Sequence, residues 1–179
     1  GKITFTWADS KTNSGRTFDR DRINAIYRSS GNKLHITEVK KKAKKTFSPA
    51  LYDLTALQRE ANQRYGYSAK MTLNIMQRLY ENHKVLTYPR TDSRYLTSDM
   101  VGTLRERLKA CAVGPYRKTA ARLSMQEIRA NKSFVDNSKV SDHHAIIPTE
   151  QYVQLEHMSS DERKIYDLVV RRFLAVLSP

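Results

Sequence analysis

The hydrophobic positions of the chain follow two patterns, one before residue 50 and one after it. Residues 3–7 and 34–39 alternate apolar with polar side chains, which predicts two half-buried strands. Between them, apolar side chains at helical spacing predict a helix that starts at Asp19 and ends before Gly31. This strand–helix–strand unit is too short to enclose a core, so we expect its sheet to continue in sequence outside the chain.

After residue 50 the apolar side chains recur at helical spacing, which predicts a helical domain. Ser68 has the residue type of a helix N-cap, and Ser159 with Glu162 has the pattern of a capping box. The predicted helices cover 51–66, 68–83, 98–113, pieces of 116–130, and 159–177, with a loop at 131–145. The side chains predicted to face the core are Leu54, Leu57, Ala61, Met71, Ile75, Met76, Leu79, Val101, Leu104, Leu108, Cys111, Ile165, Val169, Phe173 and Leu177. The predicted fold class is therefore α+β, and mainly α.

The composition allows a folded core and points to an anionic partner. The 179 residues are enough for one ordinary domain, or for one domain and a piece of another, and 39% of them are hydrophobic. The formal net charge of +14 points most simply to nucleic acid, although a ribosomal or membrane-surface protein would have the same balance. Five lysines between residues 40 and 45 form either a solvated linker or a contact with a phosphate backbone.

The single cysteine indicates the redox compartment, and the two ends of the chain indicate a longer parent polypeptide. Cys111 has no partner for an internal disulfide, and its place in a predicted helix indicates a core residue in a reducing compartment. No apolar run reaches transmembrane length, and no signal peptide opens the chain. The chain begins with Gly1 and ends at Pro179 directly after a predicted helix, so we expect a piece of a longer polypeptide.

The segment KVLTYPRTDS, residues 84–93, has the residue types that present a reactive tyrosine. A phenol with a pKa near ~10 needs a nearby cation to attack phosphorus, and Arg90 lies two residues after Tyr88. In an extended segment these two side chains project to the same side. Pro89 between them stiffens the backbone and donates no hydrogen bond. The alternative is a packed or surface aromatic residue, since the chain has ten tyrosines.

A second candidate is the pair His143 and His144 in the segment SDHHAIIPT, residues 141–149. Adjacent histidines on a strand do not easily face one metal ion, and only Asp142 accompanies them. The sequence therefore does not favour a zinc site. An ordinary pair of loop histidines is the alternative to a role beside the reactive tyrosine.

Together these segments resemble the type IA DNA topoisomerases, most closely their bacterial topoisomerase III branch. The resemblance is carried by LQREAN at 57–62, TYPRTDS at 87–93 and DHHAIIPT at 142–149, and it extends over essentially the whole chain. The combination of the three motifs is far more specific than any one of them.

The resemblance implies a reaction and its catalytic residues. Tyr88 would attack a phosphate of single-stranded DNA, forming a 5′-phosphotyrosine link and leaving a free 3′-hydroxyl. Another strand would pass through the break, which would then be resealed without ATP. Arg90 corresponds to the family's arginine that steadies the scissile phosphate or the phenolate.

The same resemblance implies four DNA-binding residues. His143 corresponds to the family's histidine that contacts DNA near the break, and His144 lies beside it. Asp92 and Ser93 belong to the tyrosine motif and are predicted to orient the turn at the DNA.

The resemblance also implies a domain organisation. Residues 48–177 correspond to the helical domain that carries the tyrosine, family domain III, and residues 1–47 to a stub of the β-rich arch, domain II. Residues 178–179 would begin the return to the arch. We find no counterpart of the family's magnesium-binding Toprim domain in this sequence. Asp19 and Asp21 superficially match the Asp-x-Asp cluster of that domain, but we interpret them as acidic side chains in the first turn of a helix.

Several expectations follow for cofactors and partners. We expect no metal site or cofactor in this chain, Mg²⁺ bound by the Toprim domain of the full-length enzyme, and no use of ATP. The isolated chain should be inactive or nearly so, with Tyr88 rather exposed. Its partners should be DNA, preferentially single-stranded, and the Toprim and arch domains of its own polypeptide. We expect a monomer in the bacterial cytoplasm, associated with the nucleoid and not with a membrane.

Two other classes of protein remain as alternatives. A tyrosine recombinase also uses tyrosine against phosphate, but its His-x-x-Arg pattern is absent, since Ile146 and Ile147 stand three positions after the two histidines. A non-catalytic helical module that binds nucleic acid would fit the charge, and in it Tyr88 would stack on a base.

Overall fold

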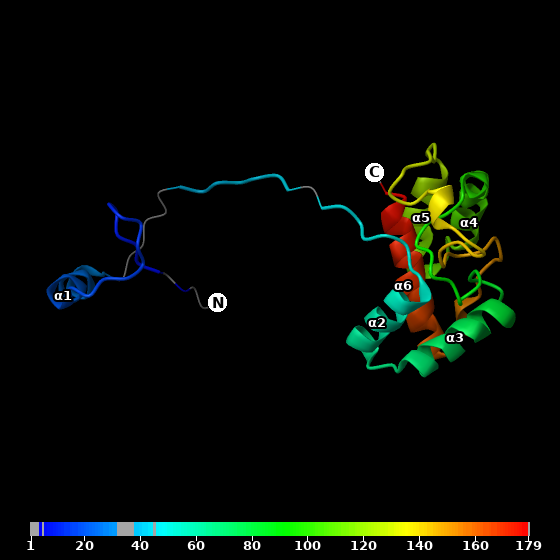
Figure 1. The fold of residues 1–179 in the computed structure, drawn as a ribbon, viewed down its shortest axis with the longest axis horizontal. Helices are drawn as coiled ribbons and strands as arrows, with labels where there is room; N and C mark the ends of the chain where they lie inside the picture. The colour runs from blue at the N-terminus through cyan, green and yellow to red at the C-terminus, as the bar shows by residue number, and fades with distance from the viewer. Residues whose placement is uncertain (1–3, 5, 32–37, 45, 179) are drawn as a thin grey trace. The chain divides into compact units, whose positions relative to one another are not determined.

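The computed structural model describes residues 4, 6–31, 38–44 and 46–178. They fall into two units, Gly1–Lys45 and Thr46–Pro179 (Figure 1). The division lies close to the boundary predicted after residue 47, and the assignment of the units to family domains stays a prediction.

The first unit contains one helix among its described residues, α1 (Arg20–Ser29). The Asp19 carboxylate caps it by accepting a hydrogen bond from the Arg22 backbone N–H. Ile23 and Tyr27 of the predicted apolar face are exposed, and no residue of α1 is buried. The helix is therefore confirmed, and its apolar face contacts no core among the described residues.

The strand predicted at residues 3–7 is wrong for the residues that the structure describes there. Thr4, Thr6 and Trp7 have no strand conformation. A strand needs a hydrogen-bonded neighbour, and none lies beside them in the described part of the unit. Most of the strand predicted at residues 34–39 lies outside the described residues.

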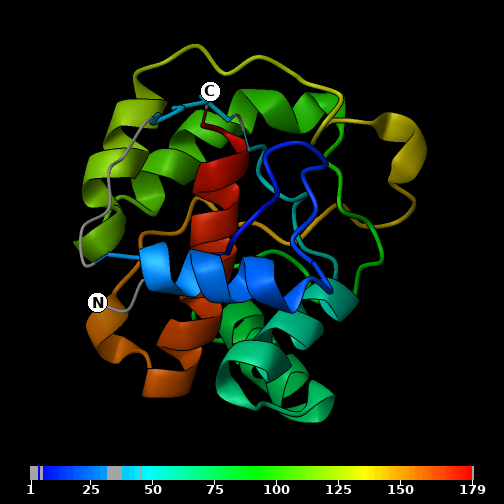
Figure 2. The same cartoon turned by 90° about the vertical axis from the view of Figure 1, so that its left-hand side faces the viewer.

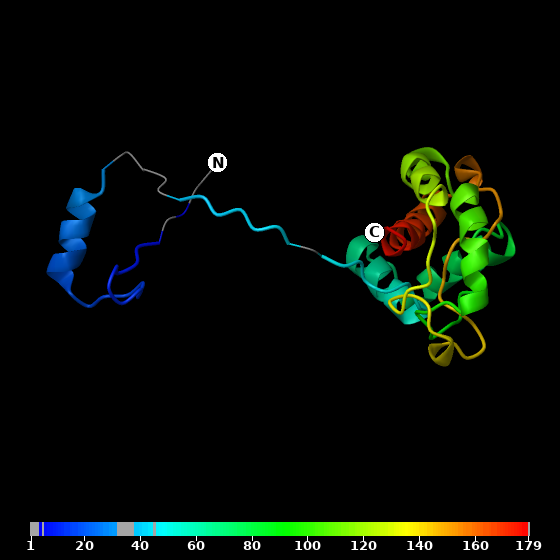
Figure 3. The same cartoon turned by 90° about the horizontal axis from the view of Figure 1, so that it is seen from above.

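The described residues of the second unit form five α-helices and four short 3₁₀ turns. The helices are α2 (Leu54–Tyr65), α3 (Ala69–Glu81), α4 (Leu104–Ala110), α5 (Arg117–Ser124) and α6 (Ser160–Val176). The turns are η1 (Ser98–Thr103), η2 (Gly114–Tyr116), η3 (Asn137–Lys139) and η4 (Leu155–His157). Figures 1 and 3 show α6 in the middle of the unit, with α2 and α3 on one side and α4 and α5 on the other. α6 packs against α2, α3 and α5, an arrangement also visible after a quarter turn (Figure 2).

The helix boundaries follow the local signals in the sequence. Gly66 ends α2 with a φ of 70°, a left-handed conformation that glycine adopts without strain. The Ser68 hydroxyl caps α3, and Ser159 and Glu162 form the predicted capping box at the start of α6. None of the described helices has the length and apolar character needed to cross a membrane.

The core of the second unit contains most of the predicted side chains, with one clear correction. Met71 was predicted to face inward, but it is 36% exposed, and the next residue, Thr72, is buried in its place. The Thr72 hydroxyl donates a hydrogen bond to the Ser68 carbonyl one turn earlier, so its polar group is satisfied inside the helix. Val101 and Leu177 are half-buried at the edge of the core.

Cys111 lies in this core, as predicted from its place in a helical pattern. Burial raises the pKa of its thiol to about 12. A thiol with so high a pKa is not a nucleophile near neutral pH, so Cys111 acts as a packing residue.

The β structure of the described residues consists of three isolated bridges. They join Tyr52 with Ile146, Leu86 with Pro148, and Leu96 with Val135. The mainly helical character of the α+β class is therefore confirmed. Two bridges join segments that lie between α3 and α6, and the third joins Ile146 to Tyr52, which precedes α2.

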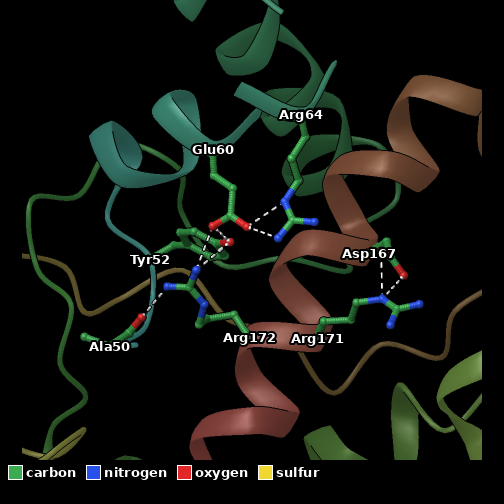
Figure 4. A network of polar contacts seen from close by, with 7 residues as sticks. All are labelled: Ala50, Tyr52, Glu60, Arg64, Asp167, Arg171 and Arg172. Atoms are coloured by element: carbon green, nitrogen blue, oxygen red, sulfur yellow. Dashed lines mark hydrogen bonds and ion pairs between the residues drawn. The ribbon is translucent and has the colours of Figure 1, made fainter. Parts of the chain in front are cut away.

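A polar network anchors the beginning of the second unit to α6 (Figure 4). The Arg172 guanidinium donates to the Ala50 carbonyl at 2.9 Å and to the Glu60 carboxylate at 2.6 Å, and it lies over the Tyr52 ring. The Tyr52 hydroxyl also donates to Glu60, and Arg64 holds the other carboxylate oxygen at 2.8 Å. Since the Tyr52 carbonyl accepts a hydrogen bond from Ile146, the network also supports the histidine segment.

Candidate active site

The segment that carries Tyr88 begins where α3 ends and reverses direction at Lys84, whose φ is 57°. The Thr149 hydroxyl donates to the Lys84 carbonyl at 2.6 Å and so holds this reversal. Backbone hydrogen bonds from Thr87 to Ile147 and from Thr149 to Val85 then align the tyrosine segment with the histidine segment. The fold therefore brings together two motifs that lie far apart in the sequence.

Tyr88 is half-buried between two other rings. Its ring centroid lies 4.3 Å from that of His143, with the planes inclined by 39°. The Tyr80 ring meets it edge to face, with the centroids 5.5 Å apart and the planes inclined by 80°. These contacts correct the expectation that Tyr88 would be rather exposed, because each ring covers part of its surface.

The residues that follow Tyr88 alternate between the interior and the surface. Pro89 is buried, whereas Arg90 and Asp92 are exposed. Within the described part of the chain, neither the Arg90 guanidinium nor the Asp92 carboxylate forms an ion pair. The predicted cation and acid therefore both face solvent on the tyrosine loop.

Thr91 and Ser93 hold the tyrosine loop in place from inside. The Thr91 hydroxyl donates to the His143 carbonyl at 2.8 Å, and the Thr91 carbonyl accepts the first N–H of α2, from Leu54. The Ser93 hydroxyl donates to the Lys139 carbonyl at 2.7 Å. Ser93 is only 4% exposed, so this conformation does not favour the surface contact with DNA predicted for it.

The two histidines have different surroundings. The His143 ring is exposed and packs on Tyr88, whereas His144 is half-buried, with Nδ1 2.7 Å from the Ala145 carbonyl oxygen. Burial lowers the pKa of His144, and the positive charge of Arg107 acts in the same direction. His143 therefore belongs to the tyrosine site by geometry, and His144 has only the weaker link of being its neighbour.

The comparisons with known proteins agree on one family. The family model for DNA topoisomerases matches residues 2–179. The chain belongs to the DNA topoisomerase family. The type IA resemblance drawn from the TYPRTDS and DHHAIIPT motifs is thereby confirmed.

The relatives of this topoisomerase chain are longer proteins. It is 62% identical over 179 residues to DNA topoisomerase 3 of Bacillus thuringiensis strain Al Hakam, and 51% identical over 178 residues to that of Bacillus subtilis strain 168. The match covers 99% of this chain and 24% of each relative. Full-length topoisomerase I from Thermotoga maritima is similar in structure, with a TM-score of 0.54 and 25% identity over 94% of this chain and 26% of that one.

Magnesium prefers carboxylate oxygens arranged around one point. No group of three or more His, Cys, Asp or Glu side chains in the described part of the chain is placed to hold a metal ion. Three such ligands therefore do not converge within the described residues, and the location of the magnesium site stays an expectation.

Sequence reasoning missed Tyr80 and the role of Thr91. Tyr80 lies one helix turn outside the motif, and its contact with Tyr88 depends on the chain reversal at Lys84. Thr91 lies inside the motif, and its residue type suits turn chemistry, but its partner is 52 residues away. Only the pairing of the two segments reveals either role.

Proposed function

We propose that this chain carries the nucleophile of a type IA DNA topoisomerase. The Tyr88 Oη would attack a backbone phosphorus of single-stranded DNA and form a 5′-phosphotyrosine bond. The P–O3′ bond would break, the phenolic proton would pass to a base, and the leaving 3′ oxygen would take up a proton from an acid or from water to become a hydroxyl. After strand passage, the 3′-hydroxyl would attack the phosphotyrosine and restore both Tyr88 and the DNA without ATP.

The contact of the Tyr88 ring with the His143 ring at 4.3 Å is the observation that carries this proposal. The two residues are 55 positions apart in the sequence and meet because their segments pair. A tyrosine packed only for stability would not require an exposed imidazole beside it. In the family the histidine acts near the break, so the shared position supports the same role for His143.

The exposed charged side chains of the tyrosine loop, Arg90 and Asp92, would act on the DNA beside Tyr88. Arg90 would steady the scissile phosphate or the phenolate, because a guanidinium pairs well with phosphate oxygens. Asp92 would orient the turn at the DNA, with His144 and Ser93 as weaker candidates. Arg90 forms no ion pair among the described residues, so its guanidinium is available to an anionic ligand.

The remaining domains of the full-length enzyme would supply the magnesium site. We propose that magnesium is held by the Toprim domain of the full-length protein, and that the isolated chain is inactive or nearly so. The partners would be single-stranded DNA and the remaining domains of the same polypeptide, with the protein acting as a monomer in the bacterial cytoplasm near the nucleoid.

End-labelled single-stranded DNA, magnesium and a denaturing gel test this function. The chain is assayed alone and in place of the matching segment of the full-length Bacillus thuringiensis relative. We expect a protein–DNA adduct with 3′-labelled but not 5′-labelled DNA, and only in the full-length protein. Tyr88→Phe should abolish it, whereas Tyr152→Phe, at a 72% exposed tyrosine, should not.

Each other result has a distinct meaning. An adduct with 5′-labelled DNA would contradict the type IA polarity. An adduct with the chain alone would contradict the need for the remaining domains. A full-length protein that binds DNA but forms no adduct would favour the non-catalytic binding module.

A further inference from the structure

The last turn of α3 places a second tyrosine against the proposed nucleophile. Tyr80 is the penultimate residue of α3, and the residue before it, Leu79, is fully buried in the core. The backbone of Tyr80 is therefore fixed by a packed helix. The chain reversal at Lys84 returns the following segment so that Tyr88 lies beside Tyr80.

The two rings meet in a geometry that favours one orientation of Tyr88. At a centroid distance of 5.5 Å and an angle of 80°, the edge of one ring points at the face of the other. This arrangement matches the positive edge of one aromatic ring to the negative face of the other. A rotation of Tyr88 away from this orientation would lose that contact.

Tyr80 is not needed to fill the core. Its side chain is 38% exposed, and within the described residues its hydroxyl forms no hydrogen bond, so the contact with Tyr88 is its most specific interaction. Met71 on the same helix has almost the same exposure, 36%, and does not belong to this ring cluster. The two residues therefore form a matched pair for separating a local role from general packing.

We propose that Tyr80 is a positioning residue that holds the Tyr88 ring, together with His143, in the orientation from which its hydroxyl reaches a phosphate. This inference rests on the proposed function. A nucleophile at the end of a rotatable side chain reacts faster when its orientation is restricted before the substrate binds. Tyr80 would supply that restriction without touching the DNA.

The orientation of the ring is tested on the chain itself by nuclear magnetic resonance with labelled tyrosine rings. We expect nuclear Overhauser contacts between Tyr88 and both Tyr80 and His143. In Tyr80→Ala the contact between Tyr88 and His143 should weaken, whereas in Met71→Ala it should persist. An unchanged contact in Tyr80→Ala would overturn the proposal, whether or not any protein cleaves DNA.

The consequence for the reaction is tested in the full-length protein with this chain in its matching position. We expect Tyr80→Ala to slow single-turnover cleavage about tenfold, with the dissociation constant for DNA changed less than about twofold. Tyr80→Phe, which keeps the ring, and Met71→Ala should cleave at the unaltered rate. Weaker DNA binding with an unchanged rate at saturating DNA would instead make Tyr80 a base-stacking residue and refute the positioning role. Failure of the unaltered protein to form an adduct would reject the proposed function, while the ring measurement would still decide the role of Tyr80.

Discussion

The hydroxyl of Thr91 illustrates how single residues make this site. It donates to the His143 carbonyl and accepts from the Ser93 N–H, so one short side chain joins the tyrosine loop to the histidine segment. The tyrosine motif identifies Tyr88 and Arg90 as candidates by their residue types, and the family resemblance adds His143. The residues that hold them in place use bonds to distant backbone carbonyls, which no local pattern reveals.

A second single residue, Glu162, makes a pH-dependent contribution to the stability of the fold. Its carboxylate accepts hydrogen bonds from Arg78 and from the Ser159 N–H, both at 2.8 Å. Burial by itself would raise the pKa of this carboxyl, but these hydrogen bonds outweigh it and lower the pKa from 4.5 to about 2. Because the pKa is lower in the folded state than in the unfolded state, the stabilisation is complete above about pH 4.5 and is lost as the pH falls toward 2.

We expect Glu162→Gln to remove this part of the acid sensitivity. In the unaltered chain, the free energy of unfolding should fall by on the order of 2–3 kcal/mol from this group between about pH 5 and pH 2. Urea unfolding at a series of pH values measures the slope. The exposed Glu156, changed to Gln, is the matched control and should keep the full acid sensitivity. A Glu162→Gln variant with the same slope as the unaltered chain would contradict this account.

At the scale of elements, the helices were predictable because their signals are local. Apolar spacing, the Ser68 cap, the Ser159–Glu162 capping box and Gly66 each act within a few residues. The sequence predicted that α3 would bury Met71, but the helix buries Thr72 instead. A polar residue can take this place because its hydroxyl forms a hydrogen bond inside the helix. The paired loop segments were also missed, because an isolated bridge has no pattern of its own.

The packing of α2 on α6 depends on Arg172, and its neighbour Arg171 offers a direct comparison (Figure 4). The Arg172 side chain is 17% exposed and reaches Ala50, Tyr52 and Glu60. The Arg171 side chain is 67% exposed, and within the described residues it pairs only with Asp167 on its own helix. We expect Arg172→Ala to lower the free energy of unfolding by about 2–4 kcal/mol, because Glu60 loses a partly buried partner. Arg171→Ala should cost less than about 0.5 kcal/mol.

Urea unfolding measures both variants of the arginine pair. Arg172→Lys should recover only part of the loss, because an ammonium group does not reproduce the forked contacts of the guanidinium. Equal effects of Arg172→Ala and Arg171→Ala would show that the network in Figure 4 does not stabilise the fold.

At the scale of the whole molecule, the net charge of +14 favours binding to polyanions. Some of the cations form ion pairs, such as Lys109, Lys164 and Arg171, but α5 carries Arg117, Lys118 and Arg122 and no acidic residue. These three side chains are exposed and form no ion pair within the described residues. They are therefore helical cations suited to meet a phosphate backbone, in addition to the lysines predicted for that role in the sequence of residues 40–45.

We expect the chain to bind single-stranded DNA with an affinity that falls steeply as salt concentration rises. Changing Arg117, Lys118 and Arg122 to Gln should reduce the slope of log K against log salt by about 2, at roughly 0.7 for each lost phosphate contact. The matched control changes Lys109, Lys164 and Arg171 to Gln, which removes the same charge from ion-paired positions and should alter the slope less. Fluorescence anisotropy at several salt concentrations measures both, and equal slopes would contradict a specific role for α5.

The sequence by itself determined the helices, the family and the candidate residues Tyr88, Arg90 and His143, because capping, apolar spacing and motif chemistry act over short distances along the chain. Only the tertiary structure decided that the tyrosine and histidine segments pair, that Tyr88 is half-buried between Tyr80 and His143, and that Ser93 faces inward. These features depend on hydrogen bonds and ring contacts between segments that meet only when the helices pack. The physical reason is that a contact between distant residues is set by the whole packed core, whereas a helix end is set by its own few neighbours.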